Sequence, residues 1–385
     1  MKILGIAAEY DPFHKGHRYH LERSMEMTGA DVSVAVMSGN FTQRGEPAVF
    51  DKWERAKAAA ENGVDLVLEL PFIYACNSAE FFAEGAVRIL EGIGASYMSF
   101  GSEAGDTALL GRAAEFFADE TDEYRAILKE GLASGKPFAK ARQEAAEKLL
   151  DADLRGLLSG SNNILAVEYM KQIILQKSSI KPVTVKRVGA DHTDDKSGGA
   201  FPSATALRAE MKKRNDKTAV FEDALFVPVM KVILSSSAEE LGRIFSVSEG
   251  LENKMKNRFR YAKDYGSLVK ELSSRRYAAS RIKRMLVHTA AGLTKSGFED
   301  ARKGIYARVL AFSEKGASAL RQIKEKDESI PVLTNINREA SGREDIRQML
   351  NFDILASDLY SLISGRDIYE NCDMLRKPYS MKDFT

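Results

Sequence analysis

The chain opens with Ile3-Leu4-Gly5-Ile6-Ala7-Ala8, an apolar run that ends in the polar stretch Glu9-Tyr10-Asp11-Pro12-Phe13-His14-Lys15-Gly16-His17. This order predicts a buried strand, a turn and the first residues of a helix. The backbone N–H groups and the positive dipole end at a helix N-terminus bind anions, and Gly16 has no Cβ to hold a phosphate away from the chain. His14 and His17 each offer an N–H to the charge that develops during displacement at phosphorus. The stretch therefore predicts a phosphate-binding site.

The histidines of the chain are concentrated at this turn. Three of the five, His14, His17 and His20, lie within seven positions, which packing alone does not require. The alternatives to a phosphate site are a surface accident or a metal site. A metal site needs a further ligand, and no carboxylate or other third ligand stands at metal-site spacing beside the pair. We therefore expect no bound metal.

Composition narrows the class of protein. The chain has 385 residues, of which 44% are hydrophobic, which is enough for at least one full core and an expected two domains. Its two cysteines, Cys76 and Cys372, form no disulfide framework and fit a reducing cytoplasm. The first apolar run is too short for a signal peptide, and no stretch of about eighteen apolar residues follows. We expect a cytoplasmic protein that does not enter a membrane, and we infer no protein partner.

Short apolar runs alternate with amphipathic segments over about the first 105 residues. Strands that alternate with helices of about ten residues are typical of βαβ units and a parallel sheet. The expected fold is therefore α/β, with a Rossmann-like parallel sheet. The expected strands are residues 3–8, 32–37, 66–70 and 97–100. Three helices are expected between them: one that begins at Lys15, one over residues 52–62 and one over residues 77–90.

Polar segments that follow these strands are expected at one edge of the sheet. Parallel sheets bind ligands beyond the carboxyl ends of their strands. Residues 38–45, Ser-Gly-Asn-Phe-Thr-Gln-Arg-Gly, follow the second expected strand, and Gly-Ser-Glu at residues 101–103 follows the fourth. We therefore expect both segments to face the same crevice as His14.

Changes in composition divide the rest of the chain. Residues from about 105 to 160 are rich in Ala, Glu and Lys at helical spacing and predict a helical insertion. A helix from near Asn162, a strand at 182–188 and a loop at 192–199 are expected next. From about residue 215 helical patterns dominate and strands are few. The expected division is a catalytic α/β domain over residues 1–215 and a mainly α-helical domain over 216–385.

A second anion site is predicted after the loop. Ser203-Ala204-Thr205-Ala206-Leu207-Arg208 opens another helix, with Ser as its N-cap and with Thr and Arg in its first turns. These side chains can hold the end of a polyphosphate opposite the histidines. The alternative is that Ser203 only caps the helix.

A basic stretch lies in the expected helical domain. Between Lys254 and Arg284 there are eleven Lys or Arg residues and two acids, which gives a local charge of +9. Aromatic residues are interleaved with these charges; basic residues neutralise phosphates, and aromatic rings stack on bases. A solvated helix face with ordinary core aromatics is the alternative. The candidate RNA contacts in this stretch are Arg275, Arg276, Arg281 and Arg284.

Together these motifs resemble a known family. His14-x-Gly16-His17 and Pro202-Ser203-Ala204-Thr205-x-x-Arg208 resemble the HxGH and ISSTxxR motifs of the nucleotidylyltransferase superfamily. Residues 9–17, 36–48, 100–103 and 162–165 more closely resemble the bacterial tRNA(Met) cytidine acetate ligases. Asp11 stands where that family more often has Asn, and Pro202-Ser203-Ala204 replaces Ile-Ser-Ser.

The resemblance implies a nucleotidylyltransferase-like catalytic domain and an ATP-dependent ligase. Members of the family are understood to form acetyl-adenylate from ATP and acetate, with release of pyrophosphate. They then acetylate N4 of the wobble cytidine in elongator tRNA(Met) and release AMP. ATP is expected to arrive with Mg²⁺, and His14, His17 and Arg208 would be catalytic. By position, the residues implied in ATP binding are Ala7, Ala8, Glu9, Tyr10, Asp11, Pro12, Phe13, His14, Lys15, Gly16, His17, Arg18, Tyr19, His20, Gly101, Asn162, Asn163, Arg187, Val188, Ser203 and Thr205.

Acetate is too small to supply much binding energy, so its pocket must be tight and mostly preformed. We expect this pocket in the loop after the second strand, where Gln43 and Arg44 can pair with a carboxylate. For Arg44 the alternatives are a tRNA phosphate contact or a loop salt bridge. The expected substrate loop contains Gly39, Asn40, Gln43 and Arg44.

Two other functions fit the same residues. A nucleotidylyltransferase that acts on a small phosphorylated metabolite would make a dinucleotide-like or nucleoside-diphosphate product and would not depend on RNA. A non-catalytic RNA-binding protein that senses a nucleotide would bind ATP without exchanging pyrophosphate.

Overall fold

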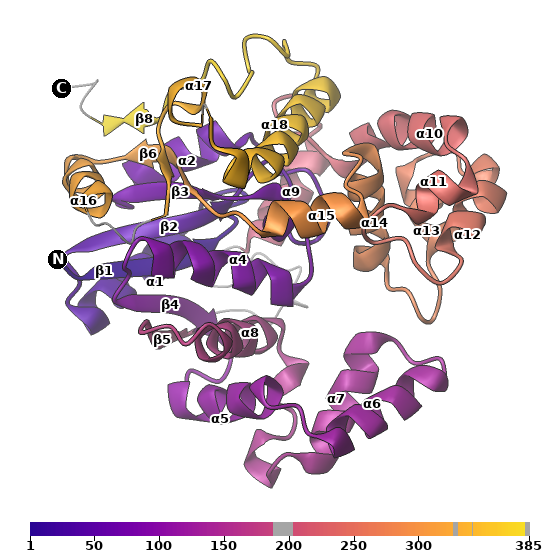
Figure 1. The fold of residues 1–385 in the computed structure, drawn as a ribbon, viewed down its shortest axis with the longest axis horizontal. Helices are drawn as coiled ribbons and strands as arrows, with labels where there is room; N and C mark the ends of the chain where they lie inside the picture. The colour runs from indigo at the N-terminus through magenta and orange to yellow at the C-terminus, as the bar shows by residue number, and fades with distance from the viewer. Residues whose placement is uncertain (188–202, 326–329, 341, 382–385) are drawn as a thin grey trace.

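The computed structural model describes residues 1–187, 203–325, 330–340 and 342–381. In these residues eight strands form one sheet in the order β5-β4-β1-β2-β3-β6-β7, and β8 pairs with β6 (Figure 1). The strands are β1 (Ile3–Ala8), β2 (Val32–Ser38), β3 (Leu66–Leu70), β4 (Tyr97–Ser102), β5 (Lys181–Lys186), β6 (Ala307–Phe312), β7 (Val332–Leu333) and β8 (Tyr379–Ser380).

Helices surround this sheet. The helices are α1 (Lys15–Thr28), α2 (Lys52–Glu61), α3 (Phe72–Ala75), α4 (Ala79–Gly92), α5 (Thr107–Ala118), α6 (Asp122–Ala133), α7 (Phe138–Leu149), α8 (Ser161–Leu175), α9 (Ala204–Lys213), α10 (Phe226–Ser235), α11 (Ala238–Gly242), α12 (Leu251–Arg258), α13 (Tyr265–Leu272), α14 (Ala279–Ala290), α15 (Lys295–Arg302), α16 (Glu314–Lys324), α17 (Ile336–Glu339) and α18 (Glu344–Ser364). Figure 1 shows α6 and α7 projecting from one side, while α10 to α14 form a group of their own. In the described ranges, none of these helices has the length and apolar character to cross a membrane.

The first five strands run parallel, and the expected α/β fold is confirmed. β1 lies between β2 and β4, while β3 and β5 extend the sheet on either side. Two strands are longer than expected, because β2 continues to Ser38 and β4 to Ser102. The end of the last expected strand, at Val188, lies outside the described residues.

Three strands come from the part of the chain beyond residue 216. β6 pairs antiparallel with β3, and β7 and β8 pair parallel with β6. β6 is apolar except for Arg308 and is almost entirely buried, and it bonds the N–H and C=O groups that β3 would otherwise expose as an edge strand. The sheet is therefore mixed, and the expected helical domain contributes to the same sheet as residues 1–215.

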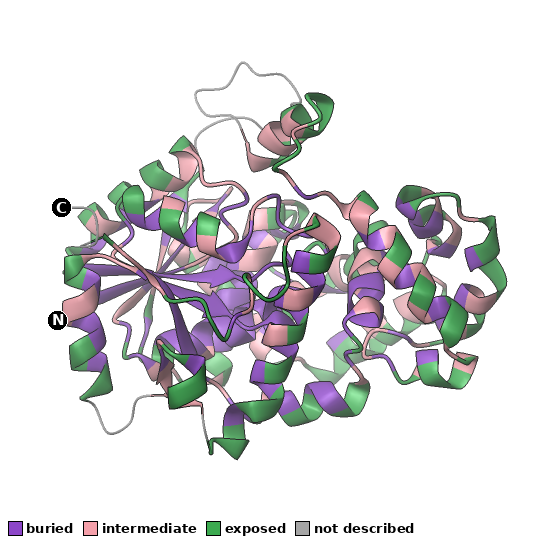
Figure 2. Ribbon diagram, turned by 90° about the horizontal axis from the view of Figure 1, so that it is seen from above, coloured by how far each residue is buried: buried purple, intermediate pink, exposed green. Residues whose placement is uncertain are grey.

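Both faces of the sheet are covered. Val36 on β2 belongs to a core cluster that includes residues of α3, α4, α8 and α18, while its neighbour Met37 belongs to a second cluster with α1 and α2. Such alternation is what a strand buried on both faces requires. Helix α4 packs directly on β1, since a Cβ at Gly5 would lie 2.3 Å from Leu90 Cδ2. Figure 2 shows the strands as a buried layer, with exposed residues on the outer surfaces of the helices.

The chain order reverses beside β1. From β1 the chain proceeds to β2 and β3 and then returns to β4 on the other side of β1. In open α/β sheets, ligands bind beyond the carboxyl ends of the strands at such a switch point. The segment that leaves β1 there is residues 9–17, so the fold places the predicted phosphate site at the position where sheets of this kind bind ligands.

A buried cluster of charged side chains joins the segment after α18, which contains Asp373, to the sheet. Lys52 Nζ, at the start of α2, lies 2.7 Å from Glu69 Oε1 on β3 and 2.7 Å from Asp373 Oδ2. Arg308 on β6 lies 3.3 Å from Glu69 and 2.6 Å from Asp373. All four side chains are buried, and the two cations balance the two carboxylates, as buried charges require.

Candidate active site

His14 and His17 hold one another at the start of α1. His14 is the N-cap of the helix, and its Nδ1 accepts a hydrogen bond from Gly16 N at 3.0 Å. His17 Nδ1 accepts a hydrogen bond from His14 N at 3.3 Å. The two rings stack with their centroids 3.7 Å apart. The motif therefore forms a reciprocal cap in which both side chains are imidazoles.

These hydrogen bonds decide where each ring carries its proton. Burial lowers the pKa of His14 to about 4, with Arg187 and Arg208 adding to the shift, and burial lowers the pKa of His17 well below its ordinary value. Both imidazoles are therefore neutral at pH 7 and can stack without charge repulsion. Since each Nδ1 accepts a backbone N–H, the single ring proton is on Nε2. Each ring thus offers an Nε2–H donor to an anion.

His20, the third histidine of the cluster, fastens α1 to the sheet. Its Nε2 lies 3.2 Å from Ser99 Oγ on β4, and Ser24 Oγ lies 2.7 Å from the same hydroxyl. Burial lowers the pKa of His20 to about 4, so this ring is neutral as well. Among the described residues, no group of three His, Cys, Asp or Glu side chains is arranged to hold a metal ion.

The turn between β1 and α1 is held from two directions. Asp11 is buried, and its Oδ1 accepts a hydrogen bond from Val49 N at 2.7 Å. Arg208 on α9 reaches the same turn, where its Nη1 donates to Asp11 O at 2.8 Å and lies 3.6 Å from Asp11 Oδ2. Tyr10 has a left-handed backbone with φ of 48°, and the bond between Asp11 and Pro12 is cis. The structure thus brings Arg208 to the histidine turn, although Asp11 and Arg208 are 197 positions apart in the sequence.

Ser203 caps α9. Its Oγ accepts a hydrogen bond from Ala206 N at 3.2 Å, which confirms Ser203 as the predicted N-cap. Thr205 Oγ1 accepts a hydrogen bond from Arg208 Nη2 at 3.2 Å and so orients the guanidinium. A hydroxyl that accepts one hydrogen bond still has its own proton to donate, so capping does not conflict with phosphate binding.

Arg55 is a buried residue of α2 that joins the ends of β1 and β2. It donates to Ser38 O at 3.1 Å and also to the carbonyls of Glu9 and Gly39. Buried carbonyls need donors, and a guanidinium has five N–H groups to supply them. Sequence reasoning missed Arg55, because its partners are main-chain atoms that leave no motif.

The loop after β2 lies against the histidine turn. Gln43 N donates to Glu9 Oε1 at 2.7 Å, and Arg44 is exposed. A Cβ at Gly39 would lie 2.7 Å from Glu69 Oε1, whose carboxylate is held by Lys52 and Arg308, so glycine allows the close approach of this loop to β3. The contact between Gln43 and Glu9 confirms that the segments after the first two strands meet at one edge of the sheet.

Asn40 is used inside this loop. It is buried, its Oδ1 accepts a hydrogen bond from Lys52 N at 2.8 Å, and its Nδ2 donates to Ser357 Oγ at 3.4 Å. Both polar groups of the side chain are therefore engaged within the protein. Asn40 therefore stabilises the loop, and of the four residues expected in the substrate loop only Gly39, Gln43 and Arg44 remain candidates for contact with acetate.

Glu103 organises a third segment at the same edge. Its carboxylate accepts hydrogen bonds from Asn162 N at 3.1 Å and Asn163 N at 2.7 Å, which caps α8. Asn163 is buried, and both polar groups of its side chain are bonded to the main chain. Asn162 is partly exposed and accepts a hydrogen bond from Arg187 Nη1 at 3.2 Å, while a Cβ at Gly101 would touch Arg187 Cγ at 3.5 Å. Asn162 Nδ2 in turn donates to Glu103 Oε1 at 2.7 Å, so the side chains of both asparagines are engaged within the protein, and Asn162 is the more exposed of the two.

Helix α14 packs against the loop after β2. A Cβ at Gly45, whose φ is +76°, would lie 2.2 Å from Arg284 N, so only glycine fits there. Lys283 pairs with Glu46, and Arg284 Nη1 donates to Gln43 O at 3.1 Å. Burial lowers the pKa of Arg284. The structure thus uses Arg284 to join the helices to the loop, a role different from that of an exposed RNA contact.

The other three arginines expected to bind tRNA lie farther along this face. Arg275 and Arg276 are exposed, and Arg276 pairs with Glu249 at 3.0 Å. Arg281 is partly buried and donates to Ser248 Oγ at 3.0 Å. Arg275 and Arg276 are therefore the two that a large polyanion can reach.

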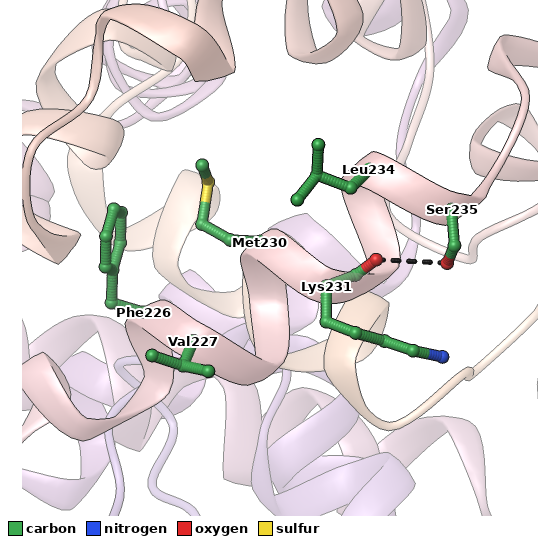
Figure 3. Close-up of a pocket in the computed structure, with 6 residues that line it drawn as sticks. All are labelled: Phe226, Val227, Met230, Lys231, Leu234 and Ser235. Carbon is green, nitrogen blue, oxygen red and sulfur yellow. Dashed lines mark hydrogen bonds between the residues drawn. The ribbon is translucent and has the colours of Figure 1, made fainter.

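Helix α10 carries an apolar hollow, which Figure 3 shows with its lining residues. Its cavity volume is about 500 Å³, and its lining contains Val227 and Leu234, which are 73% and 58% exposed. Lys231 is the one charged residue of the lining, and none of the histidine, asparagine or arginine residues described above takes part in it. The hollow lacks the set of donors that a polyphosphate needs. Its lining residues are Phe226, Val227, Met230, Lys231, Leu234 and Ser235.

Relatives of known sequence decide the family. The HIGH nucleotidyl transferase family model matches residues 1–373. The tRNA(Met) cytidine acetate ligase of Caldanaerobacter subterraneus subsp. tengcongensis is 41% identical over 94% of this chain and 95% of its own length. The enzyme of the same name from Acetivibrio thermocellus is 38% identical over 94% of both chains. This chain belongs to the tRNA(Met) cytidine acetate ligase family.

Solved structures show that the family resemblance covers the helical part as well. TmcAL of Thermotoga maritima, bound with alpha-thio ATP, matches with a TM-score of 0.89 and 31% sequence identity. The apo form of the same protein matches with a TM-score of 0.90 and 31% identity. Each match covers 99% of both chains. The architecture shared within the family therefore extends from the sheet to α10–α18, and the resemblance inferred from the sequence is confirmed.

Some predicted residues of this family site lie outside the described residues. They are Val188, Pro202 and the loop at residues 192–199. The described residues that come together at the carboxyl edge of the sheet are residues 9–17, Gly101, Asn162, Arg187 and Arg208, with Gln43 and Arg44 beside them.

Proposed function

We propose that this protein acetylates N4 of the wobble cytidine of elongator tRNA(Met) in two steps, with ATP and acetate as substrates. In the first step an acetate oxygen attacks the α-phosphorus of ATP, and the bond to pyrophosphate breaks. In the second step the cytidine N4 attacks the acetyl carbon of acetyl-adenylate, and AMP leaves. The observation that carries the proposal is the pair of neutral Nε2–H donors at the switch point of the sheet, in a chain of this family.

The donors at the start of α1 are suited to the triphosphate. The Nε2–H groups of His14 and His17 lie at the positive end of the α1 dipole, and the hydrogen bonds to their Nδ1 atoms fix both rings before the substrate arrives. Arg208 supplies a guanidinium from the opposite side of the turn. ATP is expected to enter as its magnesium complex. The chain's own residues supply positioning and charge stabilisation, which is what in-line displacement at phosphorus needs.

The remaining substrates are assigned to the segments beside this turn. Gly101 lies near the end of β4, Arg187 directly follows β5, and Asn162 is in the first turn of α8, so all three can contact the nucleoside of ATP. The loop after β2, with Gly39, Gln43 and Arg44, can hold the acetate carboxylate. Arg275 and Arg276 can hold tRNA phosphates. The wobble base must leave its stack to reach the site, and because tRNA is the substrate we place the reaction in the cytoplasm.

A labelled-substrate experiment tests this function. The purified protein is incubated with α-labelled ATP and acetate, with and without bulk tRNA, and the nucleotides are separated by thin-layer chromatography. The tRNA is then digested, and its nucleosides are analysed by mass spectrometry. We expect an acetate-dependent adenylate and pyrophosphate without tRNA, and N4-acetylcytidine with tRNA. A dinucleotide-like product, or ATP binding without pyrophosphate release, would contradict the proposal and select one of the two other functions considered from the sequence.

A further inference from the structure

Glu9 stands at the centre of the proposed site with half of its carboxylate unused. It directly follows β1, and Oε1 accepts a hydrogen bond from Gln43 N at 2.7 Å. Its main-chain carbonyl is held by Arg55. Oε2 has no hydrogen-bond or ion-pair partner among the residues that the structure describes, and the side chain is only partly buried. The carboxylate is thus fixed through one oxygen, and the other remains available to a substrate.

Groups from five different segments face this carboxylate. Asp11 lies on the turn, Arg44 on the loop after β2 and Arg208 on α9. Tyr169 on α8 and Cys76 after α3 also lie within its electrostatic reach. Burial raises the pKa of Glu9 and Asp11 adds to the shift, while the hydrogen bond from Gln43 and the charges of Arg208 and Arg44 oppose it. The carboxyl group therefore exchanges its proton closer to neutral pH than an exposed glutamate does.

Phosphate binding does not explain a carboxylate at this position. An ionised carboxylate repels the phosphates that the neighbouring imidazoles and amides attract. The two proposed steps also differ in what they need from the protein. Acetate is already an anion and gives up no proton when it attacks phosphorus, whereas the amine of cytidine must lose a proton when it forms an amide. A base is therefore required in the second step and not in the first.

We propose that Glu9 is the general base of the acetyl-transfer step, an inference that rests on the proposed function. Oε2 accepts a hydrogen bond from the cytidine N4–H, the contact by which Glu and Asp recognise cytosine. As N4 attacks, the new bond joins N4 to the acetyl carbon, and the bond between that carbon and the phosphate oxygen of AMP breaks. The N4 proton passes to Oε2 and from there to water, and AMP leaves as an anion. Glu9 thereby both selects an exocyclic amine and activates it.

The test separates the two half-reactions in the variant Glu9→Gln, whose amide oxygen can still accept the hydrogen bond from Gln43. Acetate-dependent ATP–pyrophosphate exchange reports the first step, and single-turnover transfer of labelled acetyl from enzyme-bound adenylate to tRNA reports the second. We expect a transfer rate about 10²- to 10⁴-fold lower, the range that general-base catalysis contributes, and a much smaller change in exchange. The matched control is Glu26→Gln, which removes an exposed carboxylate from α1 and should change neither rate.

The pH dependence of the wild-type enzyme gives a second measurement that does not depend on the folding of a variant. Only ionised Glu9 accepts a proton, so the transfer rate should fall as the pH is lowered through its raised pKa, while exchange should not follow the same curve. Equal loss of both half-reactions in Glu9→Gln would assign Glu9 to ATP or its magnesium and overturn the inference. Unchanged transfer, or a wild-type transfer rate that does not fall with pH, would overturn it as well. If wild-type protein makes no acetylated tRNA, the proposed function itself fails.

Discussion

His14 and His17 each use one ring nitrogen to cap a helix and leave the other for the substrate. The Nδ1 atoms of His14 and His17 accept main-chain N–H groups and so build the cap of α1. The Nε2–H groups are left for the substrate. Because burial keeps both rings neutral, they donate hydrogen bonds at pH 7 as uncharged groups. ATP binding therefore does not remove water from a charged imidazole.

Replacing His17 by Ala should slow the first half-reaction. The change removes one Nε2–H donor from the transition state, and losing one such donor costs about 2–4 kcal/mol. The acetate-dependent ATP–pyrophosphate exchange rate should fall accordingly, while exchange in Met27→Ala, which truncates an exposed residue of the same helix, should stay at the wild-type value. An exchange rate in His17→Ala that is close to wild type would remove His17 from the mechanism.

Residues with a local motif could be predicted, and residues defined by distant partners could not. His14, Gly16 and His17 were predicted because a strand, a turn and a helix start follow one another within seventeen residues. Arg55 gave no such signal, since it binds carbonyls of Glu9, Ser38 and Gly39. An arginine count likewise cannot separate the partly buried Arg284 from the exposed Arg275, because the two differ only in what packs against them.

Among the strands of the sheet, too, those with a local sequence pattern could be predicted and those placed by distant contacts could not. β1 to β5 were predicted with small errors at their ends, because each strand is followed by a helix and the hydrophobic period changes with it. β6 is a six-residue strand that is apolar except for Arg308, and nothing local shows that it returns to β3 after more than 230 intervening residues. β7 and β8 are two residues long, too short for any periodicity. Their place in the sheet depends on tertiary contacts such as those of Asp373.

The buried charge cluster makes a testable contribution to stability. Burial alone would raise the pKa of Asp373, but Arg308 and Lys52 lower it to about 2. In Asp373→Asn the two cations share only Glu69, and breaking a buried ion pair from one side costs about 3–5 kcal/mol. Urea unfolding at pH 7 should show this loss, whereas Glu370→Gln, an exposed change in the same segment, should show none.

The pH dependence of unfolding checks the same cluster. Because the folded-state pKa of Asp373 is depressed from its ordinary 3.8 to about 2, its contribution is complete above the higher value and is lost as the pH falls toward the lower one. The wild type should therefore lose stability over this window faster than Asp373→Asn does. Parallel curves for the two proteins would show that the Asp373 charge does not stabilise the fold.

In the whole molecule, the helices α10–α14 lie against the edge of the sheet that carries the proposed site. Arg284 and Lys283 on α14 contact the loop after β2, and His288 Nε2 donates to Cys76 O at 2.7 Å after α3. The exposed Arg275 and Arg276 stand immediately before this helix. A tRNA bound there would lie next to the loop proposed to hold acetate.

Neutralising Arg275 and Arg276 together should weaken tRNA binding in a salt-dependent manner. Each lost phosphate contact lowers the slope of log affinity against log salt by about 0.9 for duplex nucleic acid, so the double variant to Gln should lower it by up to about twice that amount. The control is Lys315→Gln with Arg321→Gln, an equal charge change on exposed residues of α16, which lies at the other end of the molecule (Figure 1). An unchanged slope in the first variant would place the tRNA elsewhere.

A crystal structure of this protein with a non-hydrolysable ATP analogue tests the central claim most directly. Phosphate oxygens should lie about 3 Å from Nε2 of His14 and of His17, against the first turn of α1, with the adenosine toward Gly101 and Asn162. An analogue bound with its phosphates away from both imidazoles, or a histidine turn closed by its own side chains at saturating analogue, would contradict the claim.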